Sequence, residues 1–143
     1  MRKRKGSPLG FLLFDIDYFK DVNDTHGHGV GDEILQAVGL ALVENCRAYD
    51  TPCRFGGDEF AVVIGQSEGR EALVIAKRLL AGIADIRVTS ATASVQITTS
   101  AGLVTTASIE GPVVQEQVFK GTDAALYEAK ARGRDQIVVG EIT

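Results

Sequence analysis

The feature that most constrains how this chain can fold is a pair of glycines followed directly by two carboxylates, Gly56-Gly57-Asp58-Glu59. Apolar and β-branched residues stand nearby on both sides, as in two strands joined by a tight turn. The segment therefore predicts a β-hairpin, with strands over Pro52–Phe55 and Glu59–Ile64 and acidic side chains at its tip. Taken alone, these carboxylates could equally be ordinary solvated turn residues.

A second acidic segment follows another apolar run, Phe11-Leu12-Leu13-Phe14-Asp15-Ile16-Asp17. The run predicts a buried strand over Phe11–Ile16, and the alternation of a strand places Asp15 and Asp17 on the same side. If the hairpin lies beside this strand, Asp15 approaches Asp58 and Glu59, and carboxylates that close repel unless a divalent cation neutralises them. Magnesium suits such an oxygen site, and a solvated strand end is the alternative.

Further blocks accompany these two in a fixed order along the chain. They are Asp15-Ile16-Asp17-Tyr18-Phe19-Lys20, then Asn23-Asp24, Gly27-His28 and Gly31-Asp32, then Arg54-Phe55-Gly56-Gly57-Asp58-Glu59-Phe60, and finally Asp123, Leu126-Tyr127, Ala129-Lys130 and Gly133-Arg134. From about Phe11 to Val139 the chain resembles the GGDEF family of diguanylate cyclases. The resemblance implies condensation of two GTP molecules into cyclic di-GMP and two pyrophosphates. It also implies a homodimer, since each of two facing domains holds one GTP.

The resemblance assigns the catalytic chemistry to the hairpin and the first strand. Asp15 and Asp58 are implied to bind the metal through their carboxylates, with Glu59 as a further ligand and the Ile16 carbonyl as an added one. In-line phosphoryl transfer needs such ions, Mg²⁺ or alternatively Mn²⁺, and a group that accepts the hydroxyl proton. The Asp58-Glu59 pair, beside Gly56 and Gly57, contains the candidate base, which we assign to Asp58.

A guanine pocket requires an amide and a carboxylate that reach the Watson–Crick edge of the base. Asn23 and Asp32 have these groups and lie in a glycine-rich segment that we expect to be a loop opening a helix over Gly31–Ala48. Asp32 alone would be read as a carboxylate favoured at a helix start. The resemblance instead favours guanine binding and implies that His28 lies close to the nucleotide. Phe19 is grouped with these substrate-binding residues.

Basic residues near the end of the chain predict a phosphate site. A helix is expected over about Thr122–Arg132, with Gly133 ending it, and Lys130 and Arg134 lie at that end. Basic side chains are common there because they complement the helix dipole. The resemblance implies that both hold GTP phosphates, and Lys20 is placed to do likewise.

An Arg-x-x-Asp segment precedes the hairpin. Arg47 and Asp50 could form an intrahelical ion pair of little consequence. The resemblance implies that they form an inhibitory site where cyclic di-GMP binds, with Arg78 as an additional contact. Product could also occupy the substrate pocket, so two binding modes remain open.

The order of elements predicts an α+β fold with a ferredoxin-like β-α-β-β-α-β core, as in nucleotide cyclases and polymerase palms. The sheet should be rich in antiparallel pairs, with helices packed on one face. The remaining expected elements are a helix over Arg70–Ala84, strands over Ile97–Val104 and Gln136–Val139, and short helices after Asp17 and Pro112.

The composition fits one domain. The chain has 143 residues, 45% of them hydrophobic, and we expect residues 11–143 to form the domain after a basic tail or linker remnant at 1–10. A net charge of -4 argues against a nucleic-acid surface, and no segment is long and apolar enough to span a membrane, so we expect cytoplasmic localisation. Cys46 and Cys53 are expected to be buried free thiols.

The segment that precedes the first strand in most family members is missing here. The chain therefore resembles an N-terminally truncated fragment that lacks a sensor or receiver domain. A non-catalytic receptor for cyclic di-GMP or GTP is the alternative function.

Overall fold

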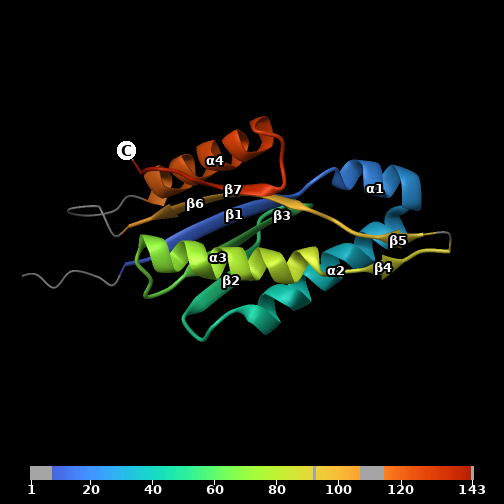
Figure 1. The fold of residues 1–143 in the computed structure, drawn as a ribbon, viewed down its shortest axis with the longest axis horizontal. Helices are drawn as coiled ribbons and strands as arrows, with labels where there is room; N and C mark the ends of the chain where they lie inside the picture. The colour runs from blue at the N-terminus through green and yellow to red at the C-terminus, as the bar shows by residue number, and fades with distance from the viewer. Residues whose placement is uncertain (1–7, 92, 107–114, 143) are drawn as a thin grey trace, which may run out of the picture.

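The computed structural model describes residues 8–91, 93–106 and 115–142. The elements are β1 (Gly10–Ile16), α1 (Phe19–His26), α2 (His28–Asn45), β2 (Asp50–Arg54), β3 (Glu59–Ile64), α3 (Gly69–Ala84), β4 (Val88–Thr89), β5 (Ser94–Val95), β6 (Thr99–Thr105), α4 (Gln115–Ala131) and β7 (Gln136–Val139). Five strands form one sheet in the order β2-β3-β1-β6-β7, and only the β6–β7 pair is parallel (Figure 1). The α+β, ferredoxin-like fold is confirmed, with β7 added at one edge.

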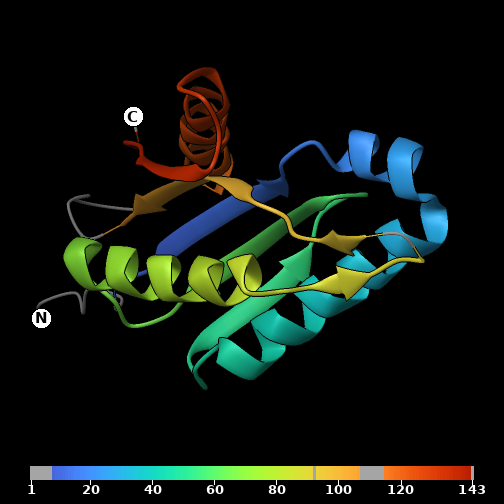
Figure 2. The ribbon, with the colours of Figure 1, turned by 45° about the vertical axis from the view of Figure 1, so that its right-hand side comes forward.

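Helices cover both faces of the sheet, so the expectation of one covered face is wrong. Leu12 and Phe14 of β1 pack in the main core with Val38 of α2 and Leu79 of α3. Leu13, which points the other way, packs with Leu126 of α4. Figures 1 and 2 show α4 on the side of the sheet opposite to α2 and α3. The reason lies in β1, whose central residues are buried on both faces and need two apolar layers.

The predicted glycine-rich loop is mostly helical. Asn23 lies within α1, which confirms the short helix after Asp17, and α2 begins at His28 rather than at Gly31. Only Gly27 separates the two helices, and its φ of 90° is a conformation that favours glycine. Helix α2 also ends earlier than expected, at Asn45, because the backbone is extended at Cys46.

The C-terminal helix is longer than expected, since α4 begins at Gln115 rather than at Thr122. Its end is as predicted. Gly133 has a φ of 112°, and its N–H donates to the Lys130 carbonyl at 3.3 Å, while the Arg134 N–H donates to the Ala129 carbonyl at 3.0 Å. These two bonds form a Schellman motif. Pro112 lies outside the described residues, so the short helix expected after it cannot be compared.

Two smaller features differ from expectation. Strands β4 and β5 form a separate two-stranded hairpin that the sequence analysis did not predict. Cys46 is partly buried, but Cys53 is exposed, so the prediction of a buried thiol is wrong for Cys53, which lies on the edge strand β2.

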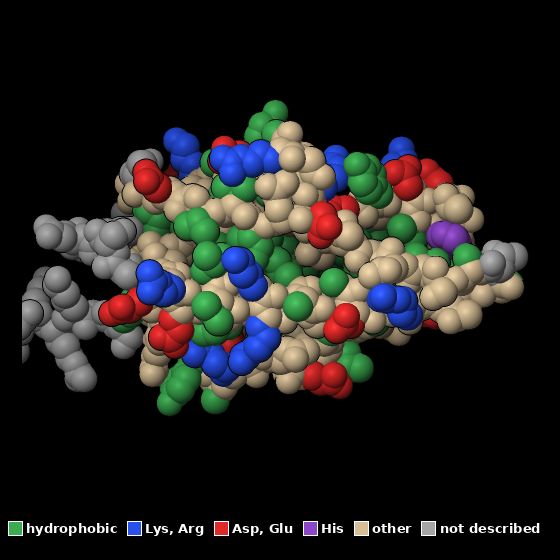
Figure 3. Space-filling view, viewed as in Figure 1, with side chains coloured by type: hydrophobic (Ala, Val, Ile, Leu, Met, Phe, Trp, Pro, Cys, Tyr) green, Lys and Arg blue, Asp and Glu red, His purple; other side chains and the backbone are tan. Residues whose placement is uncertain are grey.

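The described residues contain no helix with the length and apolarity needed to cross a bilayer. On the face shown in Figure 3, Lys and Arg side chains stand among Asp and Glu side chains over α2 and α3.

Candidate active site

The end of β1 lies directly beside the acidic hairpin. Asp15 stands opposite Glu59 in the antiparallel β1–β3 pair. The Ile16 N–H donates to the Asp58 carbonyl at 3.2 Å. Directly opposed residues on adjacent strands have neighbouring side chains, so the fold brings the carboxylates of Asp15 and Glu59 together. The predicted approach of the hairpin to the first strand is confirmed.

The turn of the hairpin is held by backbone and arginine contacts. The N–H groups of Phe55 and Gly56 donate to the Glu59 carbonyl at 2.8 and 3.3 Å. Arg54 donates from Nε to the Gly56 carbonyl at 2.9 Å and from Nη2 to the Gly57 carbonyl at 2.6 Å. Neither glycine has a positive φ, and a Cβ on Gly57 would meet no atom within 4 Å. The turn geometry does not require the glycine pair, which leaves open space beside the carboxylates.

Asp15 is only 7% exposed, and its two carboxylate oxygens differ in their partners. Lys130 of α4 pairs through Nζ with Oδ2 of Asp15. The other carboxylate oxygen, Oδ1, is buried and has no hydrogen-bond partner in the described part of the chain. An unpaired buried carboxylate oxygen is costly, and it fits the oxygen-ligand chemistry of Mg²⁺.

Glu59 has a pKa of about 6, raised first by burial, then by the negatively charged Asp15 carboxylate beside it, and further by Asp123. Lys130 opposes the rise. Two carboxylates thus share one lysine, and a divalent cation would relieve their repulsion.

Protein side chains alone do not complete a metal site. Within residues 8–91, 93–106 and 115–142, no three His, Cys, Asp or Glu side chains gather closely enough to hold an ion. The contact between Asp58 and β1 is made by its backbone carbonyl. Asp15 and Glu59 are therefore the side chains best placed for a metal, with remaining ligands supplied by water or by a bound phosphate.

The two residues expected to bind guanine lie on adjacent helices. Asn23 is on α1, and Asp32 is exposed in the second turn of α2. The Asn23 side chain lies against the backbone of Gly31, near the ring of Phe19. His28 is exposed as the first residue of α2. Phe19 itself is partly buried against the main core, so it supports α1 as well as facing this region.

The expected phosphate-binding residues come from two elements. Arg134 follows the Schellman turn at the end of α4, and its guanidinium Cζ lies 4.9 Å from the centroid of the Tyr18 ring. Lys130 lies one turn earlier, on Asp15. Lys20 is exposed in the first turn of α1. The fold thus places Tyr18, at the end of β1, against the C-terminal end of α4.

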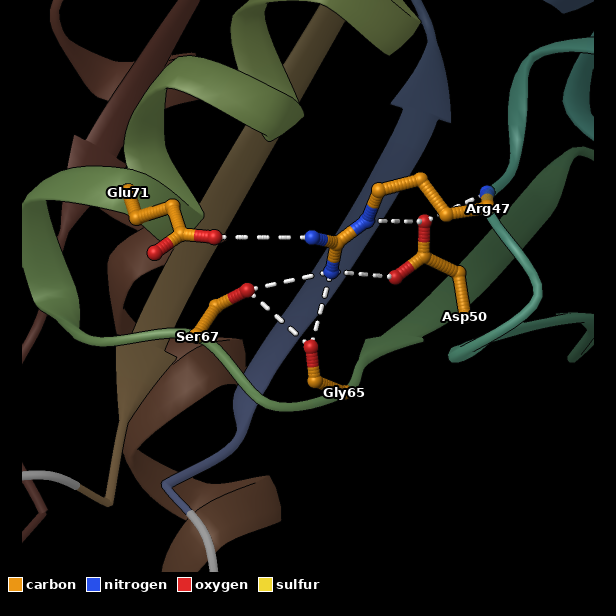
Figure 4. A network of polar contacts seen from close by, with 5 residues as sticks. All are labelled: Arg47, Asp50, Gly65, Ser67 and Glu71. Carbon is orange, nitrogen blue, oxygen red and sulfur yellow. Dashed lines mark hydrogen bonds and ion pairs between the residues drawn. The ribbon is translucent and has the colours of Figure 1, made fainter.

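Arg47, in the loop after α2, forms a bidentate ion pair with Asp50, the first residue of β2. Arg47 donates from Nη2 and Nε to the two Asp50 oxygens at 2.9 and 3.2 Å, and its backbone N–H adds a bond of 2.8 Å (Figure 4). Nη2 also donates to the Gly65 carbonyl at 2.7 Å and to Ser67 Oγ at 3.0 Å, and Nη1 reaches Glu71 at 3.5 Å. The pair is not intrahelical, because α2 has already ended.

The Asp50 side chain is fully buried, and burial alone would raise its pKa. Hydrogen bonds from the side chain and backbone of Arg47, and its positive charge, outweigh burial and lower the pKa. Arg78 does not join these contacts. Its charge instead lowers the pKa of the Cys46 thiol, which burial raises overall.

Several residues around these clusters were not predicted. Ser67, Gly65 and Glu71 surround Arg47, and Tyr18 faces Arg134. No local pattern in the sequence marks the residues around Arg47, because each contact joins segments that are distant in sequence. Only Tyr18 carried a signal, as it directly follows the Asp15-Ile16-Asp17 block.

Fold and site together define a nucleotide-cyclase-like domain with paired carboxylates where β1 meets the hairpin. The family model described as "Diguanylate cyclase, GGDEF domain" matches residues 1–136. The chain is 42% identical to the response regulator PleD of Caulobacter vibrioides over 93% of its own length and 29% of that protein. It is 37% identical to the diguanylate cyclase DosC of Escherichia coli, over 94% of its length and 29% of that protein.

Solved structures agree with this assignment. The diguanylate cyclase SiaD of Pseudomonas aeruginosa, solved with its activator SiaC, superposes with a TM-score of 0.87 at 30% identity, covering 94% of this chain and 50% of SiaD. This chain belongs to the GGDEF domain family. It spans about three tenths of the length of the curated relatives named above.

Proposed function

We propose that this domain is a diguanylate cyclase that condenses two GTP molecules into cyclic di-GMP and releases two pyrophosphates. The observation that carries the proposal is the pairing of Asp15 with Glu59 beside the open turn at Gly56 and Gly57, with one Asp15 oxygen buried and unpartnered. This arrangement offers a divalent cation two carboxylates and leaves room for a phosphate group. The kinship with named diguanylate cyclases supports the same reaction.

In the proposed mechanism, Asp15, Asp58, Glu59 and the Ile16 carbonyl would hold Mg²⁺, or Mn²⁺ in its place. Ions bound there would stabilise the charge on the phosphate oxygens and on the attacking and leaving oxygens of an in-line displacement. Asp58 accepts the proton of the 3′-hydroxyl. Glu59, with its raised pKa, is the alternative proton acceptor within the same pair.

Asn23 and Asp32 recognise guanine in this proposal, with His28 and Phe19 next to the nucleotide. Lys20, Lys130 and Arg134 bind the triphosphate. Lys130 already pairs with Asp15, so its ammonium group lies beside a carboxylate that would hold the cation.

The reaction joins two nucleotides, so two domains must face each other as a homodimer. We propose that a sensor or receiver domain elsewhere in a longer cytoplasmic protein controls this pairing. The relatives PleD and DosC are consistent with that view, because each is much longer than this chain.

We further propose that cyclic di-GMP inhibits the enzyme by binding at Arg47 and Asp50, with Arg78 as an additional contact. Arg47 lies in a loop and is partly exposed, and its planar guanidinium suits guanine's Hoogsteen edge and phosphate. Product bound in the substrate pocket is a second mode.

A receptor that binds GTP or cyclic di-GMP without turnover is the second candidate. Asn23 and Asp32 could bind the guanine base of either ligand without turnover. The intact Asp58 and Glu59 favour catalysis.

The test is incubation with GTP and Mg²⁺ over a wide range of protein concentration, with cyclic di-GMP quantified by chromatography and mass detection. A rate that rises faster than linearly with protein concentration is expected for a cyclase that acts as a dimer. Binding of GTP without any product at any concentration would overturn catalysis by this chain and favour the receptor.

A further inference from the structure

Asp17 joins three segments that meet at the end of β1. Its Oδ1 accepts a hydrogen bond from Ser100 Oγ at 2.5 Å, and its Oδ2 accepts one from Thr98 Oγ1 at 2.7 Å. Oδ2 also accepts the backbone N–H of Asp135 at 3.0 Å. The residue is only 5% exposed. Unlike Asp15, Asp17 therefore has both carboxylate oxygens occupied by donors from its own chain, and it does not face the metal position as a free ligand.

The backbone that Asp17 holds is the turn that carries Arg134. Arg134 and Asp135 have φ values of 66° and 49°, in the left-handed region that non-glycine residues rarely adopt. Such a conformation persists only where surrounding contacts impose it. Here the Schellman bonds fix the start of the turn, and the Asp17 carboxylate fixes its end. Gln136 adds a bond from Nε2 to the Arg134 carbonyl at 3.0 Å.

Tyr18, next in sequence, restrains the side chain of the same arginine. Tyr18 itself has a left-handed backbone conformation, with a φ of 56°, and the residue is 61% exposed. The Arg134 guanidinium lies 4.9 Å from the ring centroid, within the range of a cation–π contact. An arginine loses considerable rotamer freedom when it binds a ligand. Contact with Tyr18 removes part of that freedom beforehand.

We propose that Asp17 and Tyr18 are positioning residues for Arg134: Asp17 fixes the backbone of its turn, Tyr18 fixes its guanidinium, and together they prepare it to bind the nucleotide phosphates. The inference rests on the proposed function, which assigns Arg134 to the GTP phosphates. A preorganised group binds its ligand more tightly because less ordering remains to be done on binding. In this proposal, neither positioning residue contacts the nucleotide itself.

A purely structural role for Asp17 predicts a different result. If the carboxylate only satisfies the hydroxyls of Thr98 and Ser100, its loss should lower stability and weaken the binding of every ligand of the site alike. A positioning role should weaken only ligands that carry phosphates. The two roles are therefore separated by comparing a nucleotide with a nucleoside.

The experiment measures binding of 3′-deoxy-GTP and of guanosine to the full chain by calorimetry in the presence of Mg²⁺. 3′-deoxy-GTP lacks the attacking hydroxyl, so no condensation complicates the measurement. We expect Asp17→Ala and Tyr18→Leu each to weaken 3′-deoxy-GTP binding by about three- to tenfold, in keeping with one lost charge-assisted or cation–π restraint. Guanosine affinity should stay unchanged in both.

A double-mutant cycle with Arg134→Ala tests whether the effect passes through Arg134. Once Arg134 is absent, Asp17→Ala or Tyr18→Leu should cause no further loss of 3′-deoxy-GTP affinity. Two conservative variants should keep most of the 3′-deoxy-GTP affinity. Asp17→Asn retains an acceptor for the Asp135 N–H, and Tyr18→Phe retains the ring. Ser100→Ala is the matched control, because it removes a bond to Asp17 Oδ1 but leaves the bond to the turn.

Equal losses for 3′-deoxy-GTP and guanosine, or losses that add to that of Arg134→Ala, would overturn the inference. If Asp17→Ala does not fold, Tyr18→Leu gives the same comparison of 3′-deoxy-GTP with guanosine. Tyr18 is exposed, so its substitution should leave the fold intact. Failure of the proposed function looks different: the unsubstituted chain would then bind no 3′-deoxy-GTP, or Arg134→Ala would leave its affinity unchanged.

Discussion

The side-chain amide of Asn23 lies so close to the backbone of Gly31 that a Cβ on residue 31 would overlap the amide oxygen. Asn23 belongs to α1 and Gly31 to α2, directly before Asp32. The absence of a side chain on Gly31 therefore sets how closely the two proposed guanine-binding residues approach each other.

Gly31→Ala should reduce affinity for guanine nucleotides, because the new methyl group must displace either the Asn23 amide or helix α1. We expect a loss of about tenfold or more, equivalent to roughly 1.4 kcal/mol. Calorimetric titration with 3′-deoxy-GTP checks this. Gly39→Ala is the matched control on the same helix, since its Cβ would meet nothing within 4 Å. Equal affinities in the two variants would contradict the prediction.

Glu59→Gln should stabilise the metal-free protein at neutral pH. The pKa of Glu59 is about 6 in the fold, above the value of 4.5 for an unperturbed group. A raised carboxyl pKa means that ionisation opposes folding, so the penalty is absent below about pH 4.5 and complete above about pH 6. With Mg²⁺ chelated, thermal unfolding at pH 7.5 should show a Tm a few degrees higher than that of the unsubstituted chain, for a gain of about 1 kcal/mol.

At pH 4 the same two proteins should unfold at nearly equal temperatures, because Glu59 is then protonated in both states. Added Mg²⁺ should reverse the order at neutral pH by stabilising only the carboxylate form. A Tm difference that does not depend on pH would show that the neighbours of Glu59 do not raise its pKa.

Asp58→Ala should abolish synthesis of cyclic di-GMP and leave the fold intact. The hydrogen bond that joins Asp58 to β1 uses its backbone carbonyl, which the substitution retains. Removal of a general base or metal ligand lowers rates by about a hundredfold or more. Product formation and thermal unfolding measured on the same preparation test both halves of the prediction. A fully active Asp58→Ala protein would refute its assigned role.

Arg47→Ala should weaken feedback by cyclic di-GMP while preserving activity at low product concentration. It also leaves the fully buried Asp50 carboxylate without its main partner, so we expect about 2–3 kcal/mol of lost stability. Product binding should therefore be measured by calorimetry well below the variant's Tm.

Arg78→Ala provides the comparison, because Arg78 is exposed and is not among the hydrogen-bond partners of Arg47 in the described residues. The Arg78→Ala variant tests the proposed contact between Arg78 and cyclic di-GMP without disturbing Asp50. Product affinity that is unchanged in Arg47→Ala would argue that cyclic di-GMP binds in the substrate pocket instead.

Local patterns in the sequence were enough to predict the elements that carry the chemistry. The apolar run before Asp15 specified β1, and the glycine pair between apolar segments specified the β2–β3 hairpin, because alternation and turn residues act over only a few positions. Gly133 marked the end of α4 for the same reason. The ordered sequence blocks between Asp15 and Arg134 were also sufficient to indicate the GGDEF family.

Contacts between distant segments were decided only by the tertiary structure. Lys130 and Asp15 are 115 residues apart, and their pairing depends on α4 packing on the second face of the sheet, which the sequence analysis did not foresee. Asp17 likewise differs from Asp15, two residues earlier, only because Thr98, Ser100 and the turn at Asp135 surround it. The sequence by itself determined which groups are present and in which strands and turns. Packing decided which carboxylate is left with an unpaired oxygen and which is fully bonded, since burial and partners are properties of the assembled fold.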